Sequence, residues 1–216
     1  MDALTVATTR ELTDTEIVER ILAGEKKLYE CIMRKYNPRL YRVGIAIVKE
    51  DSLVEDLMQN TYIRAYEHLS RFEGRSSFST WLTRIMINEC LQFVKKQKRV
   101  TAFASENKHN MSNFEQKTPD KLAINRELAQ ALESALFELP EKYRLVFVMR
   151  EMEDMSVAET TEALSLTESN VKVRLNRAKS MLREKLNEYY KSEQVFHFYL
   201  TRCDRVVENV NKALGI

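Results

Sequence analysis

The chain contains few of the residues that interrupt helices or cross-link chains. Only four glycines and three prolines occur among its 216 residues. Because these residues favour turns and helix ends, their scarcity predicts a protein built of helices. The cysteines, Cys31, Cys90 and Cys203, are far apart and form no C-x-x-C pair. Their spacing argues against a disulfide framework or a zinc site, so we expect thiols without a catalytic role.

Signatures of catalysis and of membrane insertion are missing as well. The sequence has no glycine-rich phosphate loop, no H-E-x-x-H motif and no Ser/His/Asp arrangement. We therefore expect no enzyme activity, no cofactor and no metal. The N-terminus, MDALTVATTRELTD, lacks a basic segment followed by an apolar one. No apolar run approaches the ~18 residues that a membrane span needs, so we expect a cytoplasmic protein without direct membrane insertion.

The overall composition is that of an ordinary soluble protein with one or two modest cores. Hydrophobic residues make up 44% of the chain and charged residues 31%. The formal net charge of +2 does not by itself indicate a nucleic-acid partner. Any basic surface must therefore be sought locally.

Capping signals and helical spacing predict an all-α protein with two small helical domains joined by a flexible linker. The first domain, residues 13–99, contains capping boxes at Thr13 with Glu16 and at Ser52 with Glu55. Residues 100–118 are polar and aperiodic, as expected of a linker. A second domain then spans 119–191, and 192–216 form a C-terminal amphipathic extension whose apolar residues recur at near-helical intervals. This extension either packs on the second domain or makes a regulatory contact.

The second domain contains a predicted helix-turn-helix. Ser156 and Glu159 form a capping box that starts a short helix ending near Leu164, and Thr167 caps the next helix. Apolar residues of this second helix recur on one stripe, and between Thr167 and Leu186 six basic residues stand against two acidic ones. A basic helix face can be merely solvated surface. Its place after a short capped helix and a tight turn favours DNA binding instead.

Four segments resemble a known family in the order expected for it. LPEKYRLVF at 139–147 and NVKVRLNRAK at 170–179 resemble region 4 of the extracytoplasmic-function (ECF) group of bacterial sigma factors, within the sigma-70 family. DLMQNTYIRAY at 56–66 and FEGRSSFSTWLTRIMIN at 72–88 resemble region 2 of the same group. The resemblance implies a sigma factor that binds core RNA polymerase and directs promoter-specific initiation. The alternative is a stand-alone helix-turn-helix repressor or activator.

The resemblance also implies roles for particular residues. Contact with core polymerase is implied for Glu55, Asp56 and Gln59. Recognition of the minus-ten element, including capture of an extruded base, is implied for Phe72, Arg75, Ser76, Ser77, Asn88, Lys95 and Arg99. Recognition of the minus-thirty-five element is implied for Lys172, Val173, Arg174, Asn176, Arg177 and Lys179. Read without the resemblance, the early acids compensate a helix dipole and the aromatic residues are core.

Two residues depart from the family pattern. Ser165 stands in the turn where the family usually has glycine, and Thr160 occupies a position usually held by a larger apolar residue. A left-handed conformation at Ser165 should cost roughly 1 kcal/mol, so we expect the turn to survive under strain. The partners implied are core RNA polymerase, promoter DNA and an anti-sigma factor, with no small-molecule substrate.

Overall fold

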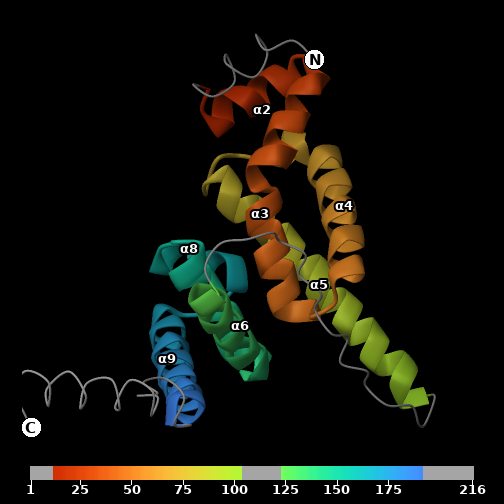
Figure 1. Ribbon diagram of the computed structural model, residues 1–216. Helices are drawn as coiled ribbons and strands as arrows, with labels where there is room; N and C mark the ends of the chain where they lie inside the picture. The colour runs from red at the N-terminus through yellow and green to blue at the C-terminus, as the bar shows by residue number, and fades with distance from the viewer. Residues whose placement is uncertain (1–11, 104–122, 192–216) are drawn as a thin grey trace, which may run out of the picture.

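The computed structural model describes residues 12–103 and 123–191, and every regular element in these ranges is a helix (Figure 1). The first lobe contains α2 (Asp14–Leu22), η1 (Lys26–Leu28), α3 (Tyr29–Val48), α4 (Asp51–Glu67), η2 (Leu69–Arg71) and α5 (Phe78–Phe103). The second lobe contains α6 (Ala123–Glu138), α7 (Glu141–Phe147), η3 (Val148–Met152), α8 (Val157–Leu164) and α9 (Glu168–Lys191). The prediction of an all-α, two-lobed protein is confirmed.

Helix α3 is the centre of the first lobe, with α4 and α5 packed against it. Fully buried Leu40 and Val43 of α3 share one core with Val54 of α4 and Met86 of α5. Gly44 lets these helices approach closely. A Cβ atom there would lie 2.4 Å from the Met86 Cε and 2.8 Å from a Val54 methyl carbon. The glycine inside α3 is therefore explained by packing, despite its low helix propensity.

Side-chain caps start several of the helices, but one predicted cap was wrong. The Thr13–Glu16 box at the start of α2 is present in both directions. The predicted cap at Ser52 is not, because α4 already begins at Asp51 after an extended Glu50. Lys49 adopts a left-handed conformation with φ of 62°, which ends α3 and reverses the chain at once. Ser52 thus lies inside the helix and its hydroxyl donates to the Glu50 carboxylate at 3.3 Å.

The linker begins later than its predicted boundary. Helix α5 continues past Arg99 to Phe103, so residues 100–103 are helical. The remainder of the predicted linker, the predicted restart at Thr118 and Pro119, and the extension at 192–216 lie outside the described residues.

The second lobe contains the expected helix-turn-helix. Its Ser156–Glu159 capping box starts α8, and the Thr167 hydroxyl accepts from the backbone N–H of Asn170 at 3.3 Å at the start of α9. Ser165 ends α8 with φ of 52° and ψ of 44°, the left-handed conformation expected from the missing glycine. Thr160 is fully buried, and its hydroxyl donates to the Ser156 carbonyl at 2.8 Å. This hydrogen bond satisfies the polar group that replaces an apolar side chain.

We predict that Ser165→Gly stabilises the protein, because glycine adopts the left-handed conformation without the steric cost of a Cβ. The expected gain is up to about 1 kcal/mol, reduced by the greater freedom of glycine in the unfolded chain. For a chain of this size, 1 kcal/mol corresponds to a rise of about 2–4 °C in Tm. Ser180→Gly in the middle of α9 is the matched control and should lower Tm. A lower Tm for Ser165→Gly would show that the turn carries no strain.

Candidate nucleic-acid interface and the contact between the lobes

Helix α9 presents a basic face on the side opposite its core stripe. Val171 and Ala178 are fully buried, as the predicted stripe requires. Of the six residues implied to read the minus-thirty-five element, Arg174 is half-buried and the others are exposed. Val173 is an apolar residue that keeps 45% of its surface exposed among these basic side chains. An exposed methyl-bearing side chain beside guanidinium and amide groups can contact both thymine methyls and the polar edges of bases.

Two cations of this face interact with neighbouring side chains through weak contacts at the surface. Lys172 pairs with Glu168 at 3.4 Å, and the Arg177 guanidinium donates to the Tyr143 hydroxyl at 3.1 Å. The hydrogen bond from Arg177 lowers the pKa of Tyr143. Exposed ion pairs contribute little to stability, so these cations can leave their partners for phosphate without large cost.

The loop before α5 rests on a cluster of three aromatic rings. The Phe72 ring lies 5.3 Å from that of Phe78 and 5.4 Å from that of Trp81, measured between centroids. Phe78 is buried at 2% exposure, whereas Phe72 and Trp81 are half-buried. Phe78 and much of Trp81 therefore pack in the hydrophobic core, and part of the Phe72 side chain stays accessible to solvent. Arg75, exposed on the loop, forms an ion pair with Glu73.

Asn88 lies further along α5 than the end of this loop. It is exposed on α5 eleven residues after Ser77, which corresponds to about 16 Å of helix rise. Lys95 and Arg99 are exposed on the same side of the helix, at i+7 and i+11 from Asn88. The loop and Asn88 mark two points of a polar track that runs along α5.

The second lobe contacts the beginning of this track. The hydroxyls of Ser77 and Thr80 each donate to the Glu159 carboxylate at 3.3 Å. Glu159 also accepts from the backbone N–H of Ser156 at 2.8 Å, as the capping box requires. These hydrogen bonds, chiefly the one from the Ser156 backbone, hold the pKa of Glu159 below its usual value. One carboxylate thus caps α8 and joins the two lobes.

A buried carboxylate forms a second contact between the lobes. Glu153 follows η3 and is 5% exposed. Its carboxylate accepts from the Arg39 Nε at 3.2 Å and pairs with Arg42, both on α3. Arg39 also donates to the Glu153 carbonyl at 3.0 Å. Burying this carboxylate would be costly without the two guanidinium groups.

A buried guanidinium forms the third contact. Arg144, the arginine of LPEKYRLVF, is 3% exposed. Its Nε donates to the Ala46 carbonyl near the end of α3 at 2.5 Å, and its Nη1 donates to the carbonyls of Phe137 and Leu139 at 3.0 and 2.9 Å. These oxygens lie where two helices end and lack intrahelical partners. Burial lowers the pKa of Arg144, yet the three carbonyls provide the acceptors that a buried cation needs.

Sequence reasoning missed all three contacts because each joins residues far apart in the chain. The available signal was chemical: arginines and glutamates interrupt apolar stretches in α3, in η3 and in LPEKYRLVF. Among the residues described, the apolar core is also continuous across the lobes, since Leu145, Met149 and Met155 pack in the cluster formed by the first lobe. The two lobes are thus packed together.

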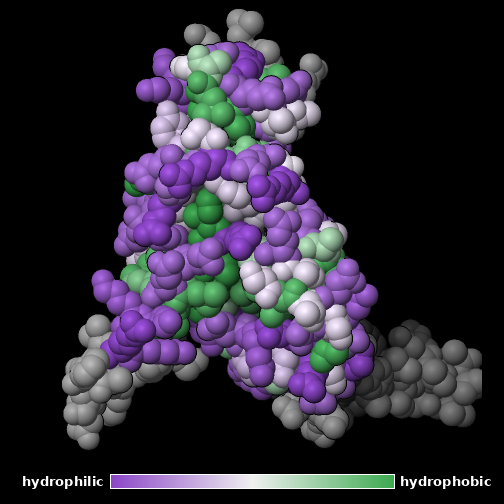
Figure 2. Space-filling view, turned by 180° about the vertical axis from the view of Figure 1, so that it is seen from behind, coloured by the Kyte–Doolittle hydropathy of each residue, from purple (hydrophilic) through white to green (hydrophobic). Residues whose placement is uncertain are grey.

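Helix α4 carries the residues implied to contact core polymerase. Glu55, Asp56 and Gln59 are all exposed. Ile63, one helical turn beyond Gln59 on the same side, is 57% exposed. An exposed isoleucine beside carboxylate and amide groups gives this face the mixed character of a protein interface. Viewed from behind, the molecule shows hydrophobic side chains reaching a largely polar surface in several patches (Figure 2).

Comparison with known families identifies both lobes. The family model "Sigma-70 region 2" matches residues 32–100, and "Sigma-70, region 4" matches 129–182. The chain is 27% identical over 183 residues to the ECF RNA polymerase sigma-E factor of Haemophilus influenzae, covering 82% of this chain and 96% of the relative. It is 25% identical to the ECF sigma factor SigW of Bacillus subtilis, covering 79% and 95% of the two chains. The chain is an ECF sigma factor of the sigma-70 family.

Two solved structures share this fold. The sigma factor RpoE of Bartonella quintana, solved with the anti-sigma factor NepR, matches with a TM-score of 0.64 and 21% identity over 74% of this chain and 96% of that one. CnrH, solved with the cytosolic domain of CnrY, matches with a TM-score of 0.58 and 21% identity over 80% and 96%. Within the described parts of this sigma factor, no helix could cross a membrane and no acidic, histidine or cysteine cluster could hold a metal.

We predict that Glu153→Gln loosens the contact between the lobes, since two guanidinium groups would lose their counter-charge. Removing one partner of a buried ion pair costs about 3–5 kcal/mol of stability. Because the two arginines here keep part of their hydration, we expect a loss near the lower end of this range. Tm should fall by several degrees, and the radius of gyration measured by X-ray scattering should increase. Glu162→Gln, an exposed change on α8, is the control. Unchanged Tm and radius for Glu153→Gln would contradict the role given to this carboxylate.

Proposed function

We propose that this sigma factor uses the face of α4 at Asp56 to dock on core RNA polymerase, the loop and track of α5 to bind the minus-ten element, and the basic face of α9 to read the minus-thirty-five element. One observation supports this proposal above all: each lobe has its own exposed polar surface, and the two lobes match regions 2 and 4 of sigma factors. The protein itself catalyses no bond change and acts in the cytoplasm with the polymerase.

The separation of Asn88 from the loop refines the minus-ten role. The loop with Phe72 and Ser77 offers a half-buried ring and hydroxyls to one base of an opened strand. Asn88 then contacts a different nucleotide of the same strand, and Lys95 and Arg99 follow its phosphates. This arrangement distributes the interaction along single-stranded DNA and needs no single deep pocket.

The distance between the two promoter elements requires the lobes to separate when both elements are bound. The names of the two elements place them about 25 base pairs apart, or about 85 Å along straight DNA at 3.4 Å per base pair. A compact chain of 216 residues has a radius of gyration of about 17 Å, hence a diameter near 45 Å. Packed lobes cannot span that distance. We infer that the contacts of Arg144, Glu153 and Glu159 break when promoter and polymerase bind.

An anti-sigma factor is the expected inhibitor. One structural relative, the sigma factor RpoE of Bartonella quintana, was solved in complex with the anti-sigma factor NepR. A partner that stabilised the packed state of this chain would keep the hydroxyls of Ser77 and Thr80 hydrogen-bonded to Glu159. It would thereby hinder minus-ten binding without touching α9.

A reconstituted transcription assay with purified core polymerase tests the function. The wild-type chain should confer promoter-specific initiation, which a stand-alone repressor would not. Asp56→Lys combined with Gln59→Ala should reduce affinity for core polymerase about thirtyfold or more, because loss of charge pairing at an interface costs about 2–5 kcal/mol. Glu19→Lys on α2 is the control for charge reversal at an exposed site. Equal affinity of the double variant and the control, in a fluorescence titration, would remove α4 from the interface.

A second experiment separates the two DNA-reading surfaces. Arg177→Ala should weaken binding to minus-thirty-five duplex by about 1–3 kcal/mol and reduce its salt dependence if a phosphate contact is lost. Asn88→Ala should leave duplex binding nearly unchanged and impair single-stranded minus-ten binding and promoter melting, followed by permanganate footprinting. Each variant serves as the control for the other. Normal promoter melting by Asn88→Ala would show that the Asn88 side chain does not bind the minus-ten strand.

A further inference from the structure

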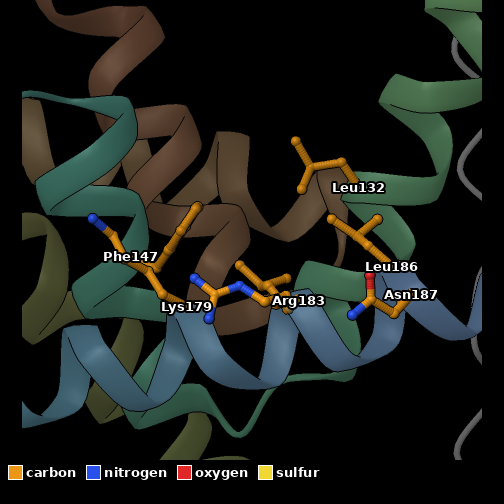
Figure 3. A pocket seen from close by; sticks show the side chains of 7 residues that line it. Leu132, Phe147, Lys179, Arg183, Leu186 and Asn187 are labelled. Atoms are coloured by element: carbon orange, nitrogen blue, oxygen red, sulfur yellow. The ribbon is translucent and has the colours of Figure 1, made fainter.

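A shallow groove crosses the second lobe and shares Lys179 with the minus-thirty-five surface assigned above. It encloses about 410 Å³ between α6, α7 and α9. Its lining residues are Leu132, Phe147, Lys179, Leu182, Arg183, Leu186 and Asn187. Figure 3 shows Leu132 of α6 on one side of the groove, facing the side where Lys179, Arg183, Leu186 and Asn187 project from α9. The groove therefore has an apolar floor and a cationic rim.

The floor of the groove is incompletely covered. Leu132 is 36% exposed, and Phe147 and Leu186 are half-buried although they pack on the small core of this lobe. Lys179 pairs with Glu151 at 2.9 Å and Arg183 is exposed. Such a surface suits an amphipathic helix that places apolar residues on the floor and acids beside the rim.

We propose that the C-terminal extension of this chain, residues 192–216, folds back and occupies the groove. The extension starts directly after α9 ends at Lys191, one helical turn beyond Asn187 in the lining. It also lies beyond the region 4 match, which ends at residue 182. The segment is long enough for a helix of about 20 residues, or about 30 Å, which exceeds the length of the groove along α9.

The sequence of the extension complements the groove in pattern and charge. Its apolar side chains recur at 3- and 4-residue intervals along one stripe: Phe196, Leu200, Cys203, Val207, Val210 and Leu214. Asp204 and Glu208 flank this stripe at positions that suit the cations of the rim. Complementary apolar and charged positions favour one orientation of the bound helix.

The register follows from a short helix-to-helix turn. With residues 192–194 as the turn, within the 2–5 residues usual for such connections, residues equally distant from it face each other. Leu200 then meets Leu186, and Cys203 lies opposite Arg183. Asp204 and Glu208 fall near Arg183 and Lys179. The register thus places a native thiol beside a groove residue.

Disulfide formation tests this register in the full-length chain. Arg183→Cys is introduced with Cys31 replaced by serine, and fully buried Cys90 is retained. Under mild oxidation, an intramolecular bond between position 183 and Cys203 should form at least tenfold faster than in Glu184→Cys. Glu184 is the adjacent exposed residue and points about 100° away around α9. Mass spectrometry of the non-reduced protein identifies the bond.

The other outcomes overturn the proposal. Equal rates at 183 and 184, or no bond at either position, would mean that the extension does not lie in the groove. A bond between two chains whose rate rises with protein concentration would assign the groove to a second copy. A thiol-labelling experiment complements the first: Leu132→Asp should expose native Cys203 and speed its labelling about tenfold, whereas Leu22→Asp on α2 should not. Circular dichroism confirms that helicity is kept, and unchanged labelling in Leu132→Asp would also reject the proposal.

Discussion

The guanidinium of Arg144 satisfies carbonyl oxygens from two lobes at once, and the packed arrangement of this sigma factor depends on it. The end of α3 and the end of α6 each leave carbonyls without intrahelical donors, and burial would make those groups costly. Arg144 donates to both ends, and Lys49 adds a hydrogen bond to the Phe137 carbonyl at 2.6 Å. Both donors are cations at helix C-termini, where the helix dipole favours positive charge.

The other contacts between the lobes are built on this junction, but they differ in how easily they can be released. Arg144 is enclosed, and Glu153 is buried between half-exposed arginines, whereas Glu159 is half-buried and one of its two hydroxyl partners, Ser77, is exposed. Water can replace the hydrogen bond between Ser77 and Glu159 at little net cost, because both side chains are accessible to solvent. Separation of the lobes can therefore begin at α8 and end at Arg144. A partner that interacts with α8 has the most accessible point of entry.

Most helices could be predicted from the sequence because their signals are local. The Ser156–Glu159 box and the left-handed Ser165 each depend on a few neighbouring residues. The Ser52 cap failed because Lys49 turned the chain before the expected position. The contact between Arg39 and Glu153 could not be predicted, since these residues are 114 positions apart and no periodicity links them. The capture of one base by the loop together with Asn88 stays a prediction.

Glu159 links two properties that a mutation would otherwise affect independently. Its carboxylate caps the first helix of the helix-turn-helix and holds Ser77 and Thr80 of the other lobe. A substitution that frees the lobes by removing this carboxylate also weakens the fold of the DNA-reading motif. A variant with looser lobes and an undamaged capping box must therefore carry its change elsewhere, for example at Glu153, on α3, or on the serine and threonine that Glu159 contacts. Selection for a less restrained sigma factor would accordingly spare this carboxylate and act on its partners or on the other contacts between the lobes.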